Sequence, residues 1–561
     1  MKRILECVPN FSEGRDPKII EAICAPIKEI DGVRILDVDM GKSTHRTVVT
    51  FAGSPEAVIE AAFQAISRAA QWIDMRKHTG AHPRMGATDV CPLIPVSGIT
   101  VEETLILARQ LGDRVGRELG IPVYMYEYAA TTPERKNLAT IRAGEYEGFS
   151  KKIYDPAWKP DYGPTEFNAV SGQTVIGVRD FLVAVNFNLN TTSVRLANSV
   201  AFDVRENGRI KTQNGKPNGP PELDANGQPL RIPGMLKACK GVGWFIEEYG
   251  FAQVSMNLTQ LSVTSLHQAF EAVVKSATQR GLRVTGTEIV GLLPKSTLVD
   301  AGRYFLTQQG RSTGVGDAEL IRIAIHTLGL SEIRPFHPKE KIIEYCLEDP
   351  FGPLASQTVV KFTEGLASDS PAPGGGSVSA LCGALAAALT AMVANLSAGK
   401  RGWEDQVDYF SSIADKAQQI REELLWLLDE DTRSFDQVML AFGLPKQTPE
   451  EKELRKKAIE EATIYAAEIP LRVMEAAYAC LPLVLQMTEK GNPNSISDAG
   501  VGGLCAWACL SGAAYNVQIN LKDMKDHPQT PELMGRCKTL LTSGKEMATK
   551  IENLMHQHLE E

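Results

Sequence analysis

The sequence predicts a multidomain protein in which two α/β subdomains with the split β-α-β, ferredoxin-like order precede an all-α domain. A chain of 561 residues is too long for one hydrophobic core. Strand and helix patterns alternate through the first part of the chain, and beyond the expected linker only helical periodicity remains. We expect domains over 1–180, 181–345 and 358–561, with a linker at 346–357.

The first subdomain follows the element order β-α-β-β-α-β, which is typical of the split βαβ arrangement. The segments "RILECVP" and "RILDVDM" are expected strands, with a helix at about 17–30 between them. The segments "HRTVVTFAG" and "DVCPLIPV" are expected strands on either side of a second helix at 54–73. In that helix Ser54 suits the N-cap, Pro55 the first helical position and Glu56 the first turn.

The second subdomain repeats this order. A strand is expected at 181–190 and a helix at about 192–207. The segments "GVGWFIEE" and "FAQVSMNL" are expected to form a hairpin, followed by a helix at about 264–279 and the strand "TEIVGLLP". The stretch 207–234 is polar and rich in Gly, Pro and Asn, which predicts an exposed insertion. Ligands tend to bind in the cleft between two such subdomains.

The C-terminal part consists of long helical stretches, which predict a helical bundle. They are expected at about 377–398, 404–443, 449–487, 497–521 and 531–558. The apolar run at 378–396 approaches the length of a membrane span, but it is rich in Ala and includes Asn395. We therefore expect a tightly packed buried helix there, and no membrane association.

The composition, net charge and cysteine distribution of the chain indicate which classes of protein it can belong to. The apolar share of 43% and charged share of 23% are typical of a soluble globular protein, and the net charge of −9 argues against nucleic-acid binding. The ten cysteines are scattered, and the Cys505–Cys509 pair has apolar neighbours, so reduced thiols in a cytoplasmic protein are expected. The N-terminus shows no secretion-signal pattern.

The stretch "DMRKHTGAHPRMGATDV" places His78 and His82 four residues apart, and three interpretations remain open. A zinc pair needs helical geometry, but the helix is expected to end near Gly80, and Pro83 disfavours a helical His82. The residues could instead form a structural turn. Alternatively, a histidine on this loop could act as a general base, with Arg84 and its basic neighbours attracting a carboxylate substrate.

Two C-terminal features suggest a second site. The run "SPAPGGGS" precedes an apolar helix, which suggests either an anion-binding helix start or a hinge. In "REELLWLLDEDTRSFDQVMLAF", Asp431 shares the apolar helix face, whereas Asp429 and Asp436 are expected to project away from it. A carboxylate facing a core is costly unless paired, and such groups gather at active sites. A structural Asp paired with a buried Arg or Ser is the alternative.

Several blocks of the sequence are similar to the formimidoyltransferase-cyclodeaminase family, and the resemblance covers nearly the whole chain. The blocks are "ILECVPNFSEG", "DVDMGKSTHRTV", "DMRKHTGAHPRMGATDVCPLIPV", "IRAGEYEG", "RPFHPKEKIIEY", "SPAPGGGSVSA" and "LLDEDTRSF". The resemblance implies a bifunctional enzyme of histidine degradation. It would exchange a formimidoyl group between N-formimidoyl-L-glutamate and tetrahydrofolate, and then close 5-formimidoyltetrahydrofolate to 5,10-methenyltetrahydrofolate with release of ammonia.

The resemblance also implies site residues. The family's catalytic histidine falls on His82 and its catalytic aspartate on Asp431. Its folate loop falls on "GPTEFNAVSG" (163–172). In that loop Gly163, Pro164, Phe167 and Gly172 are expected to contact folate.

Further binding residues are expected on both sides of the linker. Asp39 either polarises the reacting centre or caps the hairpin that follows its strand. The helix start formed by Gly374, Gly375, Gly376 and Ser377 would bind folate through free N–H groups.

The resemblance further implies tetrahydrofolate as carrier, in polyglutamylated form, with no metal. It implies glutamate and formimidoylglutamate as the other substrates, and a homo-oligomer built from dimers, for example an octameric ring. Two alternatives come from other classes of protein. The helical domain could be an assembly module without catalysis, or the chain could bind and sense folate without turnover.

Overall fold

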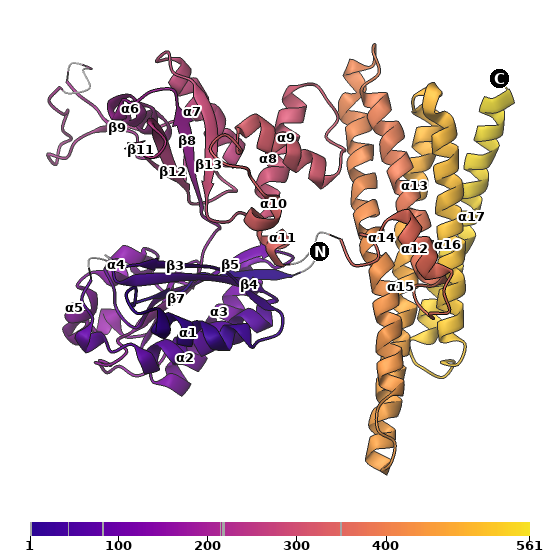
Figure 1. Ribbon diagram of the computed structural model, residues 1–561, viewed down its shortest axis with the longest axis horizontal. Helices are drawn as coiled ribbons and strands as arrows, with labels where there is room; N and C mark the ends of the chain where they lie inside the picture. The colour runs from indigo at the N-terminus through magenta and orange to yellow at the C-terminus, as the bar shows by residue number, and fades with distance from the viewer. Residues whose placement is uncertain are drawn as a thin grey trace. The chain divides into compact units, whose positions relative to one another are not determined.

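The computed structural model describes residues 3–42, 44–80, 83–213, 215, 219–347 and 351–560. The chain divides into two compact units, shown in Figure 1. The first contains Met1–Leu298 and Ile325–Glu348, and the second contains Val299–Ala324 and Asp349–Glu561. The second unit thus includes a short segment that the sequence-based division places in the second α/β subdomain.

The first sheet begins with a complete ferredoxin-like core. Its strands are β1 (Ile4–Cys7), β2 (Asn10–Phe11), β3 (Val33–Gly41), β4 (Arg46–Gly53), β5 (Thr88–Ser97), β6 (Val123–Glu127) and β7 (Thr174–Val178). The spatial order β3-β4-β1-β5 is antiparallel throughout, and β7 and β6 extend the sheet in parallel beyond β5. The predicted β-α-β-β-α-β order is confirmed.

Helices cover both faces of this sheet. The long ones are α1 (Pro17–Lys28), α2 (Pro55–Trp72) and α3 (Val101–Leu119), which share a hydrophobic core with one face. The short ones are α4 (Leu138–Arg142), α5 (Glu145–Lys152) and the 3₁₀ turns η1 (Met75–Lys77), η2 (Pro133–Arg135) and η3 (Pro156–Trp158). Ile141 and Phe149 from α4 and α5 pack on Tyr124 and Tyr126 of the other face.

Helix α2 confirms the expected helix at 54–73, but helical geometry does not continue to Gly80. The helix ends at Trp72 rather than near Gly80, because Ile73 is extended (φ −107°, ψ 117°) and Asp74 caps the separate turn η1 by accepting from the Arg76 N–H. At its other end Ser54 is the N-cap residue as predicted, but its side chain makes no capping hydrogen bond. The histidine stretch therefore follows a 3₁₀ turn and not a long helix.

The second sheet has the same order of elements. It consists of β8 (Val183–Leu189), α6 (Val194–Val204), β11 (Cys239–Ile246), β12 (Phe251–Leu258), α7 (Leu266–Thr278) and β13 (Val284–Val290). The strand order β11-β12-β8-β13 repeats the ferredoxin-like core, including the predicted β11–β12 hairpin. Between α6 and β11, most described residues of the 207–234 insertion are exposed, and they include the small pair β9 (Arg209–Ile210) and β10 (Arg231–Ile232).

Four further helices precede the linker in the described chain. They are α8 (Lys295–Gln308), α9 (Asp317–Leu328), α10 (Pro338–Lys341) and α11 (Ile343–Leu347). Within the second compact unit, Arg303 donates to Asp415 at 2.5 Å and Thr313 donates to the same carboxylate at 2.9 Å. These contacts explain why part of α8 and α9 belongs to the C-terminal unit.

The C-terminal unit is a bundle of long helices, as predicted (Figure 1). They are α12 (Val359–Leu366), α13 (Gly375–Ala398), α14 (Val407–Phe442), α15 (Pro449–Lys490), α16 (Ile496–Leu521) and α17 (Thr530–Glu560), with the 3₁₀ turns η4 (Glu404–Gln406) and η5 (Pro493–Ser495). Helix α13 is long and apolar enough to cross a membrane, but it packs against α14, α15 and α16, and 61% of its most apolar window is buried. This arrangement agrees with the predicted buried helix.

Candidate active sites in the two units

Asp431 lies where α14 crosses the start of α13. Its carboxylate Oδ2 accepts a hydrogen bond from the Ser377 hydroxyl at 3.1 Å, and the Ser377 backbone N–H also bonds the carboxylate. Burial raises the pKa of Asp431, and the two hydrogen bonds from Ser377 act in the opposite direction. Burial thus makes the Asp431 carboxyl hold a proton more tightly than an exposed aspartate would.

Gly376 makes this approach possible. A β-carbon on Gly376 would overlap the Asp431 carboxylate, whereas a β-carbon on Gly375 would make only ordinary contact with Asn516. Gly374 is the N-cap and Gly375 the first helical residue, so the glycine run opens a regular helix and the hinge interpretation is not supported. The first-turn N–H of Ser377 is used by Asp431, which corrects the expectation that this N–H is free for folate. Folate contacts of Gly374, Gly375 and Gly376 remain predictions.

The neighbouring acidic residues of α14 do not all behave as expected. Asp436 is exposed, as predicted. Asp429, however, is only 7% exposed, because its carboxylate accepts the backbone N–H groups of Leu354 (2.7 Å) and Ala355 (3.2 Å). The expectation that Asp429 projects away from the core is therefore wrong: it anchors the segment that follows the linker.

Glu430 was not singled out from the sequence, yet it is buried. It accepts from Tyr465 of α15 at 2.7 Å and from Arg433 at 2.5 Å. Its partner from α15 lies far along the chain, so helix periodicity alone would not reveal it. Asp429 and Glu430, which precede Asp431 in α14, are thus both tied to protein groups.

In the first unit, four of the sequence blocks that carry the family resemblance meet around two stacked imidazoles. The rings of His45 and His78 lie 4.2 Å apart with an interplanar angle of 13°. His45 contacts the Glu13 carboxylate at 3.2 Å through Nε2 and the Thr79 carbonyl at 2.8 Å through Nδ1. Glu13 and His45 were missed by reasoning from the sequence, although both stand inside the blocks that carry the family resemblance.

The hydrogen bonds of His78 fix its protonation state. The Arg84 Nε–H donates to Nδ1 at 3.2 Å, so Nδ1 must be the acceptor and Nε2 carries the proton, which it donates to the His45 carbonyl at 2.9 Å. Burial lowers the pKa of His78, with its cationic neighbours acting in the same direction. Because both ring nitrogens bond to protein, His78 is not placed as a metal ligand in this arrangement. Among the described residues, no group of three or more His, Cys, Asp and Glu side chains is placed to hold a metal ion.

Arg84 is buried inside a carboxylate clamp. Its Nη1 donates to Glu145 (2.9 Å) and Glu147 (3.0 Å), and its Nη2 donates to Glu147 at 2.6 Å. A substrate carboxylate would have to replace one of these glutamates, so binding of substrate by Arg84 remains a prediction. His82 lies outside the described residues, as does Ala81 before it.

The loop 163–172 packs directly on Met85 and Gly86, which follow Arg84 in the chain. Gly172 has a left-handed φ of 67° and pairs with Gly86, and a β-carbon there would overlap the Met85 carbonyl. Gly163 also has a left-handed φ, of 82°, and a β-carbon there would overlap the Ile121 carbonyl. These two glycines are therefore required by the protein's own backbone packing, whatever their role toward a pterin.

The loop also contributes an aromatic side chain, Phe167, which contacts Tyr146 beside the glutamates that bind Arg84. Phe167 is half-buried against Tyr146, with ring centroids 5.3 Å apart, and Pro164 is partly exposed. Tyr146 in turn donates to the Ala169 carbonyl at 2.5 Å, and its own N–H donates to the Arg84 carbonyl. The structure thus brings the predicted folate loop next to the block that contains His82.

Asp39 is exposed on β3, opposite Val48, and it contributes to the electrostatic environment of Arg46. The hairpin after β3 is closed by Thr44, whose hydroxyl donates to the Gly41 carbonyl at 3.0 Å. The polarising role of Asp39 remains a prediction.

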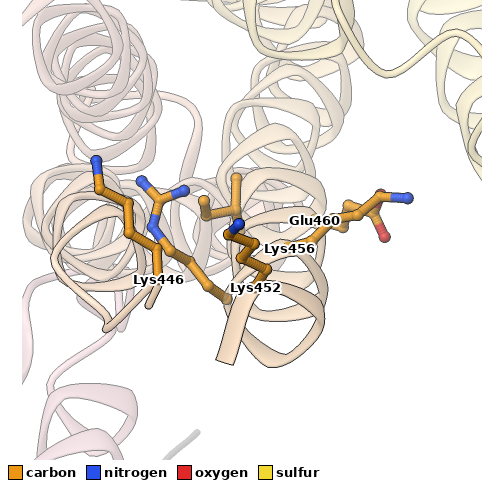
Figure 2. A pocket seen from close by; sticks show the side chains of 6 residues that line it. Lys446, Lys452, Lys456 and Glu460 are labelled. Carbon is orange, nitrogen blue, oxygen red and sulfur yellow. The ribbon is translucent and has the colours of Figure 1, made fainter. Parts of the chain in front are cut away.

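A depression of about 440 Å³ lies at the turn between α14 and α15. It is lined by Lys446, Lys452, Arg455, Lys456, Ile459 and Glu460. Figure 2 shows Lys446 on the turn and Lys452 and Lys456 on the first part of α15 around this hollow. Arg455 also donates to the Phe442 carbonyl at the end of α14, which ties the two helices together. The surface is strongly cationic and was not noticed in the sequence.

Comparison with known proteins matches each part of the chain. Residues 4–179 match the formiminotransferase domain, N-terminal subdomain; residues 184–348 match the formiminotransferase domain; and residues 358–539 match formiminotransferase-cyclodeaminase. The chain is 39% identical over 553 residues to a formimidoyltransferase-cyclodeaminase of Mus musculus, covering 98% of each chain.

Two other relatives match one part each. The chain is 40% identical over 306 residues to a glutamate formimidoyltransferase of Streptococcus pyogenes serotype M1, covering 54% of this chain and 94% of the relative. It is 39% identical over 189 residues to a methenyltetrahydrofolate cyclohydrolase of Methylorubrum extorquens, covering 34% of this chain and 91% of the relative.

The two ferredoxin-like cores, the helical bundle and these matches define a fusion of a formiminotransferase module with a cyclodeaminase module. The chain belongs to the formimidoyltransferase-cyclodeaminase family.

Proposed function

We propose that this chain carries out two consecutive reactions of histidine degradation on one folate. The enzyme is bifunctional: its α/β part exchanges the formimidoyl group between N-formimidoyl-L-glutamate and tetrahydrofolate, and its helical part converts 5-formimidoyltetrahydrofolate to 5,10-methenyltetrahydrofolate and ammonia. The observation that carries the second activity is the partly buried Asp431 carboxyl, which is hydrogen-bonded to Ser377 at the start of α13. We assign the acid/base role in cyclodeamination to this residue.

The chemistry requires one group that moves a proton in both directions. The folate N10 forms a bond to the formimidoyl carbon, N10 loses its proton, and the bond to the leaving nitrogen breaks as that nitrogen gains a proton and departs as ammonia. Asp431 would take the N10 proton as a carboxylate and return a proton to the leaving amine as a carboxylic acid. The pKa raised by burial suits this double role, because the carboxyl holds a proton more tightly than an exposed aspartate does and can return it to the leaving amine.

The test uses the full chain with Asp431→Asn. We expect this variant to lose the formation of the methenyl chromophore from 5-formimidoyltetrahydrofolate while keeping formimidoyl transfer to tetrahydrofolate. Asp429→Asn serves as a comparison, since Asp429 bonds to backbone N–H groups and not to Ser377. Wild-type cyclodeaminase rates in Asp431→Asn would refute the assignment.

For the transferase, His82 is the proposed base, on the basis of its position in the "HPRMG" block. The supporting observation is the convergence of Glu13, His45, His78 and Arg84 beside the 163–172 loop. Since both ring nitrogens of His78 are engaged, His78 is a poor alternative base. His82→Ala should abolish formimidoyl transfer and leave cyclodeamination intact. If transfer is instead lost in His78→Ala and kept in His82→Ala, His78 is the base and His82 is not.

A second activity of the helical part has its own support, because one relative of that part is named a methenyltetrahydrofolate cyclohydrolase. Water and ammonia attack or leave the same one-carbon bridge, so Asp431 could serve hydrolysis as well. Decay of the methenyl chromophore after addition of 5,10-methenyltetrahydrofolate would reveal this activity. Decay no faster than in buffer would leave cyclodeamination as the activity of this part.

We propose that the folate carries a polyglutamate tail and that the cationic depression at the α14–α15 turn binds it. From Asp431 to the end of α14 at Phe442 the helix rises roughly 16 Å. An ordinary extended chain spans at most about 3.6 Å per residue and a γ-linked one spans more, so about five glutamates reach this turn. Carboxylates of the tail would meet Lys446, Lys452, Arg455 and Lys456.

Charge reversal tests this assignment. Lys452→Glu with Lys456→Glu should raise KM for the pentaglutamate substrate and leave KM for the monoglutamate within about twofold. An equal effect on both substrates would place the tail elsewhere. Lys538→Glu, which reverses the charge of an exposed lysine of α17, is the matched control.

We further propose that the chain is a cytoplasmic homo-oligomer built from dimers. All ten cysteines are free thiols, which suits a reducing compartment. The neighbouring helices α13 and α16 expose two apolar stripes that another copy would cover. The stripes contain Leu385, Met392 and Leu396 on α13, and Val501, Leu504, Tyr515 and Ile519 on α16. Light scattering of wild type and Leu504→Lys measures the assembly; an unchanged mass in the variant would exclude this face.

A further inference from the structure

Ser377 gives its hydroxyl proton to Asp431, so this proton is not free to bind substrate. Its side chain is fully buried, and its hydroxyl donates to Asp431 Oδ2 at 3.1 Å. The hydroxyl of Thr432 lies 3.2 Å from the Ser377 Oγ. Because Ser377 has one hydroxyl proton and gives it to the carboxylate, Thr432 must donate to Ser377. The three groups form a chain that runs from Thr432 through Ser377 to Asp431.

We propose that Ser377 is a positioning residue for cyclodeamination, which holds the Asp431 carboxyl over Gly376 in both of its protonation states. This inference rests on the proposed acid/base role of Asp431. In the charged state the hydroxyl and the first-turn N–H of Ser377 both donate to the carboxylate. When Asp431 is protonated, its O–H donates to Ser377 Oγ, and Ser377 turns its own proton toward Thr432.

A hydroxyl suits this task because it can donate or accept, whereas a backbone N–H can only donate. The positive end of the α13 dipole favours the charged carboxylate, and burial favours the neutral acid. The Ser377 hydroxyl can bond to either state, because it donates to the charged carboxylate and accepts from the neutral acid. The helix start therefore binds the enzyme's own carboxylate, which sets a fixed geometry at the reacting nitrogen.

Other charged groups near this point are already committed. Glu430 of α14 accepts hydrogen bonds from Arg433 of the same helix and from Tyr465 of α15. Asp429 accepts a hydrogen bond from the segment before α12. On α16, the side chain that a β-carbon at Gly375 would contact is Asn516, which is uncharged. In the described part of the chain, burial and Ser377 are the causes that shift the pKa of Asp431, and no charged side chain is among them.

The experiment measures kcat and KM of the full-length enzyme as functions of pH, using the methenyl chromophore. Ser377→Ala removes a hydrogen bond to a charged group, so kcat should fall roughly tenfold to a hundredfold. KM should stay within about twofold, and the acidic limb of the profile should move to higher pH, because the charged carboxylate loses a donor. Ser377→Thr keeps the hydroxyl and should recover most of the rate.

Ser379→Ala is the matched control, since Ser379 is buried in the same helix but donates to the Gly375 carbonyl at 2.7 Å. It should keep the wild-type pH profile. Thr432→Val provides a second variant if Ser377→Ala does not fold, and it should shift the same limb by a smaller amount. A carbon-13 label on the aspartate carboxyls would follow the Asp431 titration directly, with Asp431→Asn assigning the signal.

An unchanged pH profile in Ser377→Ala, or a rise in KM alone, overturns the positioning role while Asp431→Asn stays inactive. Activity in Asp431→Asn instead refutes the proposed function itself. The two failures are therefore distinguishable.

Discussion

The α-carbon of Gly376 lies against the carboxylate of Asp431, so closely that no other residue fits at position 376 without moving the carboxylate. The two residues are brought together by the crossing of α13 and α14. Since the contact is made by backbone on one side and by the proposed catalytic group on the other, it connects the packing of the bundle directly with its chemistry.

Gly376→Ala should therefore abolish cyclodeaminase activity while formimidoyl transfer continues. The added methyl group overlaps the Asp431 carboxylate and forces the side chain or the helix start to shift. Both activities are measured on the same preparation. Gly365→Ala in α12, where a β-carbon meets open space, should leave both rates unchanged. Full cyclodeaminase activity in Gly376→Ala would show that Asp431 need not occupy this position.

Asp429→Ala should destabilise the C-terminal unit. The change leaves the N–H groups of Leu354 and Ala355 without their acceptor, at a cost of about 1–3 kcal/mol. Urea unfolding monitored by circular dichroism measures the loss. Asp431→Asn should cost less stability, because burial already disfavours the charged form of that group. A reversed order of the two variants would mean that the partners of Asp429 do not anchor the segment.

Glu6→Gln should stabilise the first unit at alkaline pH. Burial raises the pKa of Glu6 from 4.5 to about 7, partly offset by Arg179. The folded state therefore binds this proton more tightly than the unfolded chain, and the stabilisation present below pH 4.5 is lost as the pH rises through 7. At pH 8 the variant should gain roughly 3 kcal/mol over wild type, and at pH 4 almost nothing.

Thermal and urea unfolding of both proteins at the two pH values measure this difference. Glu56→Gln, an exposed carboxylate of the same unit, controls for the loss of one negative charge. Equal gains at pH 4 and pH 8 would contradict a titrating Glu6.

His78→Gln should make the first unit less sensitive to acid. Burial lowers the pKa of His78 below its usual 6.5, so the unfolded chain binds the proton more tightly. The stability that neutral His78 contributes is present above pH 6.5 and is lost as the pH falls below it. Protonated Nδ1 would also face the Arg84 Nε–H. Gln retains a donor for the His45 carbonyl but does not titrate.

The measurement is the difference in unfolding free energy between pH 7.5 and pH 5.5, which should be smaller in the variant than in wild type. His326→Gln, on α9, is the matched control. Parallel stability curves for wild type and His78→Gln would contradict the proposed neutral state.

Gly172→Ala should lower stability and transferase activity together. The residue has a left-handed φ of 67°, which costs an L-residue roughly 1–2 kcal/mol, and the new methyl group overlaps the Met85 carbonyl. Saturating folate should not restore the rate, since the strain is in the protein. Gly148→Ala, with open space around its β-carbon, should be neutral. A pure KM effect in Gly172→Ala would favour direct contact with the pterin.

Much of the architecture follows from local patterns. The period of apolar residues predicts the helices of the bundle and the two β-α-β-β-α-β units, because burial of one face imposes that period on any chain. The same reasoning places Asp431 on the inward face of α14. Family blocks of the sequence further locate His82, Asp39, the 163–172 loop and the glycine run, for which the structure leaves the roles to experiment.

The tertiary structure alone decided which groups meet. Periodicity places Asp429 on the outer face, yet a segment 75 residues away supplies two N–H groups and buries it. The Glu13–His45–His78–Arg84 cluster joins strands and loops that are not neighbours in sequence, and Ser377 meets Asp431 across 54 positions. A helix or strand pattern records whether a side chain faces inward, but its partner depends on how distant elements pack, and that partner sets its charge and its chemistry.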